Sequence, residues 1–161
     1  MTLNKILKNT LLSISACLLL SACATQKTVT SGSQMQGDVY TGTDTVKELA
    51  PGVPDRVFFA TNESILTTAS RETLRKQAEY LRKNSSMNIV LEGHADERGT
   101  REYNLALGER RANAAKDYLM TYGISASRIS VISYGKERPV DSGSNPLAWS
   151  KNRRPVTVKA N

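Results

Sequence analysis

Four short apolar runs in the C-terminal part of the chain predict β-strands. Each run is rich in aliphatic, β-branched or aromatic residues and is bounded by polar or turn-forming residues. The runs are 56–60, 87–92, 129–134 and the segment that begins at Pro155.

Apolar residues at three- and four-residue spacing lie between the first three runs and predict two long helices. The first begins at Thr67 or Thr68 and reaches about Lys83, and the second extends from Thr100 to about Tyr122. Asn145 and Pro146 are typical of the start of a short helix, in which Trp149 is the expected apolar anchor. This order predicts an α/β (α+β) two-layer sandwich of the βαβαβ-β type. We expect a mixed four-stranded sheet with both long helices on one face, because strand–helix–strand crossovers are right-handed.

The predicted inward stripe of the second helix contains two residues that are unusual in a core. Arg111 and Asn104 lie two turns apart on this face, and arginine is almost never buried unless it is paired. The nearest acid placed to face Arg111 is Asp96, just past the end of the second strand, where ligands bind in open α/β sheets. The stripe comprises Asn104, Leu107, Arg111, Ala114, Ala115, Tyr118 and Tyr122.

Two interpretations of these polar residues remain open on the residue types alone. In the structural one, Asp96 and Arg111 form an internal ion pair and Asn104 holds the adjacent loop in place. In the functional one, a negative group and a positive group are held apart so that a zwitterionic ligand can bridge them.

The N-terminus has the pattern of an export signal. Lys5 and Lys8 precede an apolar run, 11–20, which is too short to cross a bilayer as a helix. Ser21-Ala22-Cys23 after Leu20 resembles a bacterial lipobox, which predicts a signal peptide over 1–22 and a lipid on Cys23. The alternative is an ordinary secretory signal with a chance cysteine.

Lipidation at Cys23 would determine where the chain resides. Removal of the signal takes away Cys17, so the one remaining cysteine carries lipid and no disulfide is expected. Ala24 is not the aspartate that resembles an inner-membrane retention signal, which favours the outer membrane. Residues 23–52, rich in Thr, Ser, Gly and Gln, are expected to be a lipidated flexible linker, with the folded domain at 53–161.

The chain has a formal net charge of +7. A basic balance suits nucleic acid, but an exported lipoprotein rarely meets any. A polyanionic wall polymer or an ordinary solvated surface explains the sign equally well.

Four motifs in register are similar to those of the peptidoglycan-associated lipoproteins, whose C-terminal domain is OmpA-like. The resemblance covers about 53–161, and the lipobox and linker agree with it independently. The motifs are 93–100, 103–112, 133–137 and 150–154.

The resemblance implies that the domain binds peptidoglycan without catalysis or cofactor, through the meso-diaminopimelate of the stem peptide. Asp96 and Arg111 would hold the amino and carboxylate groups of that residue, and Asn104 would line the same crevice. It also implies a role in the Tol-Pal system of the cell envelope and cell division, with a TolB-like β-propeller protein as periplasmic partner. The implied ligand-binding set is Asp96, Arg111, Asn104, Leu107, Phe59, Ala60 and Thr61.

One position departs from the family pattern. Ala60 stands where an aspartate usually follows the first-strand aromatic residue, so backbone contacts from 59–61 are expected there rather than a side-chain contact. Arg153 is expected to brace the site rather than to touch the ligand.

Other chemistry has little support in the sequence. His94 is the one histidine, which makes a metal site with Asp96 and Glu97 improbable, and we expect it to order the loop instead. No Gly-x-Ser-x-Gly motif indicates a serine hydrolase. A flagellar stator relative would need a transmembrane helix.

Overall fold

The computed structural model describes residues 35–160. The expected signal peptide (1–22) and the expected lipid site at Cys23 lie outside these residues. The elements in chain order are β1 (Met35–Gln36), β2 (Val39–Tyr40), β3 (Glu48–Ala50), β4 (Val53–Pro54), α1 (Thr68–Lys83), β5 (Ile89–His94), α2 (Arg101–Thr121), a 3₁₀ turn (Ala126–Arg128), β6 (Ile129–Gly135), α3 (Pro146–Asn152) and β7 (Pro155–Lys159). Among these residues, no helix has both the length and the apolar character that crossing a bilayer requires.

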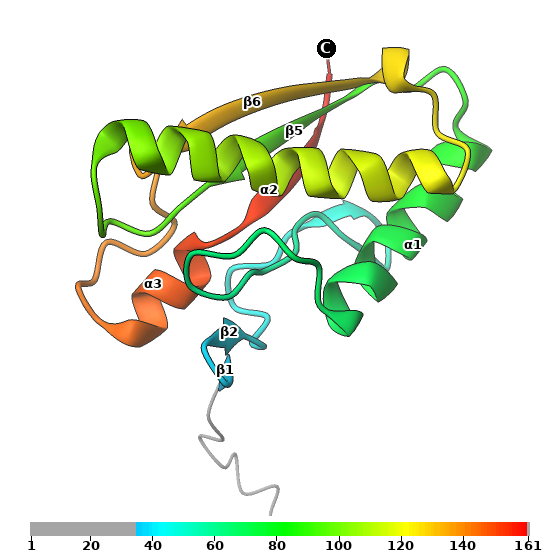
Figure 1. The fold of residues 1–161 in the computed structure, drawn as a ribbon. Helices are drawn as coiled ribbons and strands as arrows, with labels where there is room; N and C mark the ends of the chain where they lie inside the picture. Colours follow the sequence, from blue (N-terminus) through cyan, green and yellow to red (C-terminus); the bar gives the residue numbers. More distant parts are fainter. Residues whose placement is uncertain (1–34, 161) are drawn as a thin grey trace, which may run out of the picture. The chain divides into compact units, whose positions relative to one another are not determined.

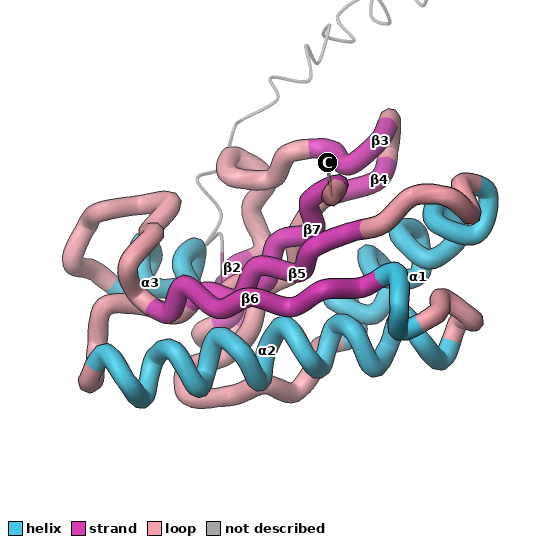
Figure 2. The backbone as a smooth tube through the Cα atoms, turned by 90° about the horizontal axis from the view of Figure 1, so that it is seen from above, coloured by secondary structure: helices cyan, strands magenta, loops and turns pink. Residues whose placement is uncertain are grey.

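The central sheet has three strands in the order β6-β5-β7 (Figure 2). β5 is parallel to β6 and antiparallel to β7, so the sheet is mixed as expected. The predicted four-stranded sheet is wrong in its first strand, 56–60, which forms only an isolated bridge from Arg56 to Val156.

The reason lies in the carbonyl groups of this segment, which face side chains instead of a neighbouring strand. The N–H of Phe59 still donates to the Arg153 carbonyl at 3.0 Å, so the segment follows the chain just before β7. The Phe58, Phe59 and Ala60 carbonyls, however, accept hydrogen bonds from Ser70, Arg153 and Arg111, respectively. A continuous ladder cannot form when its acceptors are used in this way.

Both long helices pack on one face of the sheet, as predicted (Figure 1). Thr67 and Thr100 cap them by accepting hydrogen bonds from the N–H groups of Ser70 and Tyr103. The core between the layers takes Leu74, Ala78 and Leu81 from α1, Ile89 and Leu91 from β5, and Ala112, Ala115 and Leu119 from α2.

The buried face of α2 is rotated slightly from the predicted stripe. Tyr118 and Tyr122 lie at the edge of the core, where their hydroxyl groups are 3.3 Å apart. Gly108 lies under the sheet instead. Helix and strand approach so closely here that a Cβ added to Gly93 would come within 2.0 Å of the Gly108 carbonyl oxygen. This close approach brings the polar members of α2 to the end of β5. The buried residues of α2 are Asn104, Leu107, Gly108, Arg111, Ala112, Ala115 and Leu119.

The folded domain begins earlier than the predicted boundary at 53. Residues 35–54 form two short hairpins, β1-β2 and β3-β4, instead of an extended linker. Tyr40 and Leu49 are buried, and the Tyr40 ring meets the Phe58 ring edge to face with centroids 4.8 Å apart. Isolated apolar residues anchor this segment. Because they form no periodic pattern in a polar composition, the sequence predicted a linker here.

The short helix α3 begins at Pro146 with Asn145 as its cap, as predicted. Trp149 is not its apolar anchor, since Ala148 takes that position in the core. Instead the Trp149 indole donates to Glu97 at 2.8 Å, and the Arg98 guanidinium lies 4.4 Å above the indole ring. The helix thus supports the loop that follows β5.

Candidate functional site

Arg111 is fully buried at the end of β5, on the sheet side of α2. Its guanidinium donates to three backbone carbonyl oxygens: Nε to Glu63 at 2.8 Å, Nη1 to His94 at 3.1 Å and Nη2 to Ala60 at 3.0 Å. The Phe59 ring lies 5.6 Å from the guanidinium carbon. The side chain therefore holds β5 and the 60–63 turn together around a buried positive charge.

The Asp96–Arg111 ion pair of the structural interpretation is not formed. Within residues 35–160, Arg111 makes no salt bridge to any carboxylate, and its hydrogen bonds use three of the five guanidinium N–H groups. Burial, together with the nearby charge of Arg153, lowers the pKa of Arg111 to about 10, which still leaves it charged at neutral pH. A buried cation without a counter-ion is costly, and an incoming anion would offset part of that cost.

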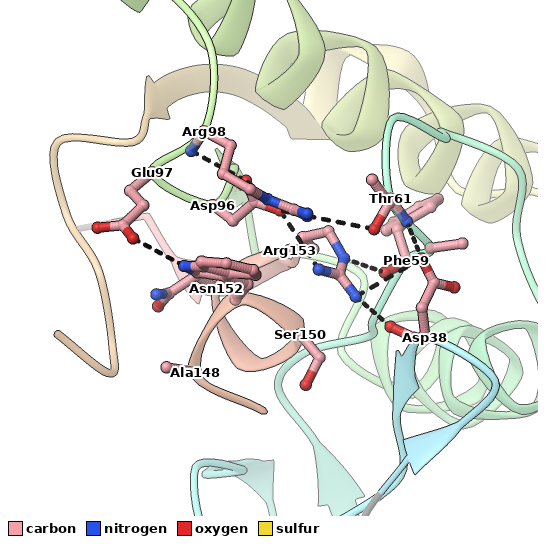
Figure 3. Close-up of polar contacts among 12 residues, drawn as sticks. Asp38, Phe59, Thr61, Asp96, Glu97, Arg98, Ala148, Ser150, Asn152 and Arg153 are labelled. Atoms are coloured by element: carbon pink, nitrogen blue, oxygen red, sulfur yellow. Dashed lines mark hydrogen bonds and ion pairs between the residues drawn. The ribbon is translucent and has the colours of Figure 1, made fainter. Parts of the chain in front are cut away.

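Asp96 is paired with two other arginines (Figure 3). Its carboxylate accepts from Arg98 Nη2 at 2.7 Å and from Arg153 Nη1 at 3.3 Å. Its Oδ1 also accepts the backbone N–H of Arg98 at 3.1 Å, as in an Asx turn. Burial raises the pKa of Asp96, but the hydrogen bonds and charge of Arg98 outweigh this effect and hold the pKa below its usual value. We call Asp96, Arg98, Arg111 and Arg153 the arginine–aspartate cluster.

Arg98 was missed as a site residue by the sequence reasoning. The signal was its position two residues after Asp96, the spacing at which a side-chain turn forms. Arg153 braces the site, as predicted: it is buried, and its Nε donates to the Phe59 carbonyl at 3.0 Å. Arg153, at the end of α3, thus connects Asp96 with the extended segment 56–60.

The remaining predicted residues surround the cluster. Asn104 donates to the Arg98 carbonyl at 2.8 Å and so holds the 94–100 loop, as the structural interpretation expected. Leu107 is buried beneath, Ala60 contributes its carbonyl, and the Thr61 hydroxyl accepts from Arg98 Nη2 at 3.3 Å. All seven predicted residues therefore gather around the end of β5.

A further acidic residue, Asp38, reaches the cluster from the N-terminal segment. Its Oδ2 accepts the backbone N–H of Thr61 at 2.6 Å. Its own carbonyl accepts from Arg153 Nη2, whose distance to the Asp38 carboxylate is 3.8 Å (Figure 3). Sequence reasoning missed Asp38 because it lies in a segment that reads as a linker.

Two cavities lie beside the central residues of the cluster rather than at them. A cavity of about 470 Å³ lies between the 36–46 segment and the start of α1, and a smaller one of about 180 Å³ lies beside Glu97 and Asn152. Neither is lined by Asp96, Asn104 or Arg111. Residues 35–160 contain no group of three or more His, Cys, Asp and Glu side chains arranged to hold a metal ion.

His94 lies beside the cluster without hydrogen bonds from its ring. It is buried, and within the described part of the chain neither ring nitrogen makes a hydrogen bond, although Nε2 lies 4.0 Å from the Glu92 carboxylate. Burial, with the charges of Arg154, Arg56 and Arg138, lowers its pKa to about 3. The ring is thus neutral at physiological pH. His94 contributes its backbone carbonyl, not its ring, to the hydrogen bonds of Arg111.

Comparison with known proteins identifies the family. The OmpA family model matches residues 58–153. The chain is 42% identical over 150 residues to the peptidoglycan-associated lipoprotein of Mesorhizobium japonicum, covering 92% of this chain and 89% of that protein. The protein of the same name from Agrobacterium fabrum is 44% identical over 144 residues, covering 88% and 81%.

Solved structures show the same fold. The crystal structure of the peptidoglycan-associated lipoprotein from Burkholderia pseudomallei matches with a TM-score of 0.66 at 34% identity, covering 70% of this chain and 95% of that chain. The C-terminal domain of Helicobacter pylori MotB shares the fold alone, with a TM-score of 0.62 at 19% identity over 66% of this chain and 84% of that chain. The chain belongs to the OmpA family and, within it, to the peptidoglycan-associated lipoproteins.

Proposed function

We propose that this chain binds peptidoglycan non-covalently at the arginine–aspartate cluster, by taking up the meso-diaminopimelate residue of the stem peptide. The names of its relatives support association with peptidoglycan. The observation that carries the proposal is Arg111, a buried guanidinium that contacts only carbonyl oxygens and retains N–H groups for an anion. The role is adhesion, without catalysis.

Diaminopimelate suits the two charges of the cluster. Its side chain ends in an ammonium and a carboxylate on one carbon, so it presents both signs to the site. The carboxylate would form a charge-assisted pair with Arg111, and the ammonium would be accepted by Asp96 in competition with Arg98. A lysine at the same place in the stem would lack the carboxylate and leave Arg111 without an anion.

Binding requires the 60–63 turn or the loop after β5 to move, because Arg111 is fully buried. Arg98 is the more exposed partner of Asp96, since its side chain is 42% exposed while that of Arg153 is 2% exposed. We therefore expect Arg98 to give way to the ligand ammonium and Arg153 to stay in place. Arg98 would then be free to contact the rest of the stem peptide.

A lipid at Cys23 would place this domain in the periplasm beneath the outer membrane. Two or more acyl chains hold a protein stably, whereas one holds it only marginally. The anchored domain would then face a repeating polymer, so that a modest affinity for one stem would suffice through effective concentration. The chain would thereby tether the outer membrane to the wall.

Sedimentation with purified wall sacculi tests the proposal. We expect Asp96→Ala and Arg111→Ala to abolish co-sedimentation, since losing one partner of a sheltered charge pair costs about 2–5 kcal/mol. Arg110→Ala is the matched control, because Arg110 is exposed on α2 and its guanidinium contacts only the Tyr103 ring, at 5.8 Å.

Circular dichroism must show that each variant is folded. A free stem peptide containing diaminopimelate should release the unmodified protein from sacculi, and the lysine form should not. Undiminished sedimentation of folded Arg111→Ala would refute the assignment.

A second candidate function is docking of a TolB-like β-propeller protein of the Tol system near the same site. Two large apolar side chains of the segments around the cluster support it, since Ile65 is 69% exposed and Tyr103 is 42% exposed. Ile65→Asp should weaken binding of the propeller protein in a pull-down and leave sacculus binding unchanged. Simultaneous tight binding of propeller and stem peptide would argue against a shared surface.

A further inference from the structure

The N-terminal hairpin, residues 35–40, lies against the arginine–aspartate cluster. It comprises β1, the turn at Gly37-Asp38 and β2. Through Asp38 it reaches the backbone N–H of Thr61 and the guanidinium of Arg153, which itself holds Asp96 (Figure 3). The hairpin and the proposed ligand site therefore share residues.

Asp38 presents the chemistry that the site is expected to recognise. A carboxylate that accepts a backbone N–H and lies 3.8 Å from a guanidinium reproduces the contacts of a bound carboxylate ligand. The hydrogen bonds from Thr61 and the charge of Arg153 outweigh burial and keep the pKa of Asp38 below its usual value. The side chain is thus ionised at neutral pH and occupies these donors.

We propose that the N-terminal hairpin is an internal competitor, which holds the arginine–aspartate cluster closed through Asp38 and must leave for the stem peptide of peptidoglycan to bind. This inference rests on the proposed function. It agrees with the absence of Asp96 and Arg111 from the lining of the two cavities, since Arg98 and Arg153 pair with Asp96 and Asp38 in turn contacts Arg153.

The hairpin is built to detach easily. Its strands have two residues each, and so short a ladder is marginal without support. The cavity of about 470 Å³ lies beneath Gln36, Val39 and Tyr40, so the hairpin is incompletely packed against α1. Tyr40 is 2% exposed and fixed on Phe58, so only the residues before it need to move.

Gly37 provides the turn that directs Asp38 inward. Its φ of +65° lies in the left-handed region, and a Cβ there would meet no atom within 4 Å. The Asp38 side chain remains 47% exposed, so the competing contact is accessible to solvent and to a ligand. Displacement of Asp38 would free the Thr61 N–H, which belongs to the proposed ligand-binding set.

Titration of the full chain with a stem peptide containing diaminopimelate, compared with Asp38→Ala, tests the inference. We expect Asp38→Ala to bind about tenfold more tightly, because the apparent dissociation constant falls when the competent state is fully populated. Glu48→Ala is the matched control: it removes the same charge from an exposed residue of β3 and should not change the affinity.

Hydrogen exchange in the absence of peptide checks the contact itself. The Thr61 amide should be protected in the unmodified chain and exchange about tenfold faster in Asp38→Ala, with no change in Glu48→Ala. This measurement requires no ligand. It therefore shows whether the Asp38–Thr61 contact forms, independently of whether the stem peptide binds.

Each outcome decides between the two proposals. Tighter binding together with faster Thr61 exchange supports the inference. Equal or weaker binding by Asp38→Ala, while the unmodified chain binds, overturns the inference and leaves the proposed function intact. Absence of binding by both proteins, despite faster Thr61 exchange, refutes the proposed function and the inference with it.

Discussion

Two charged residues at the end of β5 have different partners. Asp96 is paired with arginines, whereas Arg111 is held by backbone carbonyl oxygens. The burial of Arg111 could be predicted from its position on the inward stripe of α2. Its partners could not be, because several arginines lie within reach of Asp96 and spacing alone does not say which one is bound. The structure pairs Asp96 with Arg98, two residues later in the chain, and with Arg153 from the end of α3.

Replacing Asp96 should cost stability as well as binding. In Asp96→Asn an amide would face the Arg98 and Arg153 donors, so that Arg98 would lose its counter-ion and Arg153 would keep only the more distant Asp38. We expect the free energy of unfolding to fall by about 3 kcal/mol, measured by urea denaturation. Asp117→Asn, at an exposed position of α2, should change it by less than about 0.5 kcal/mol. A similarly small effect of Asp96→Asn would show that the cluster does not hold the loop.

His94 should make folding sensitive to acid. Burial lowers its pKa from 6.5 to about 3, so the unfolded chain takes up a proton that the folded chain refuses. Stability is therefore lost as the pH falls from 6.5 towards 3, by about 2 kcal/mol at pH 5. The His94 ring lies 5.6 Å from the Tyr134 ring between centroids, so His94→Phe should keep this packing and flatten this part of the curve of unfolding free energy against pH. An unchanged slope would contradict the account.

At the scale of elements, capping residues and apolar periodicity predicted the helices closely. The apolar run at 56–60 predicted the first strand wrongly. Thr67, Thr100 and Asn145 all cap helices where expected, because capping depends on neighbouring residues only. The 56–60 segment has strand-like composition, yet its carbonyls serve Ser70, Arg111 and Arg153. Such side-chain donors, which come from residues distant in the sequence, leave no mark in the local pattern.

The close packing of α2 on β5 gives a test at this scale. Alanine usually stabilises a helix by about 1 kcal/mol relative to glycine. In Gly108→Ala, however, the new Cβ would lie 2.4 Å from Ser133 Oγ and 3.0 Å from the Gly93 carbonyl oxygen. We expect a net loss of about 1–3 kcal/mol in thermal or urea unfolding.

Ser133→Ala should recover part of that loss in the double variant, because it removes the closer of the two contacts. A Gly108→Ala protein more stable than the unmodified chain would show that the helix and strand can separate at little cost.

For the whole molecule, the family could be predicted, but the extent of the domain could not. Motifs within 93–154 carry the family resemblance, and the structure brings these motifs to the end of β5. The 35–54 segment reads as a linker because its contacts depend on single residues, such as Tyr40 and Asp38, that form no pattern.

Calorimetric titration of the full chain with two stem peptides tests the central claim most directly. The peptides differ only in carrying meso-diaminopimelate or lysine at the same position, so they differ in one carboxylate. Because that carboxylate is assigned to Arg111, we predict that the diaminopimelate form binds at least about thirtyfold more tightly. Equal affinity for the two peptides would contradict the assignment of this buried guanidinium to the wall.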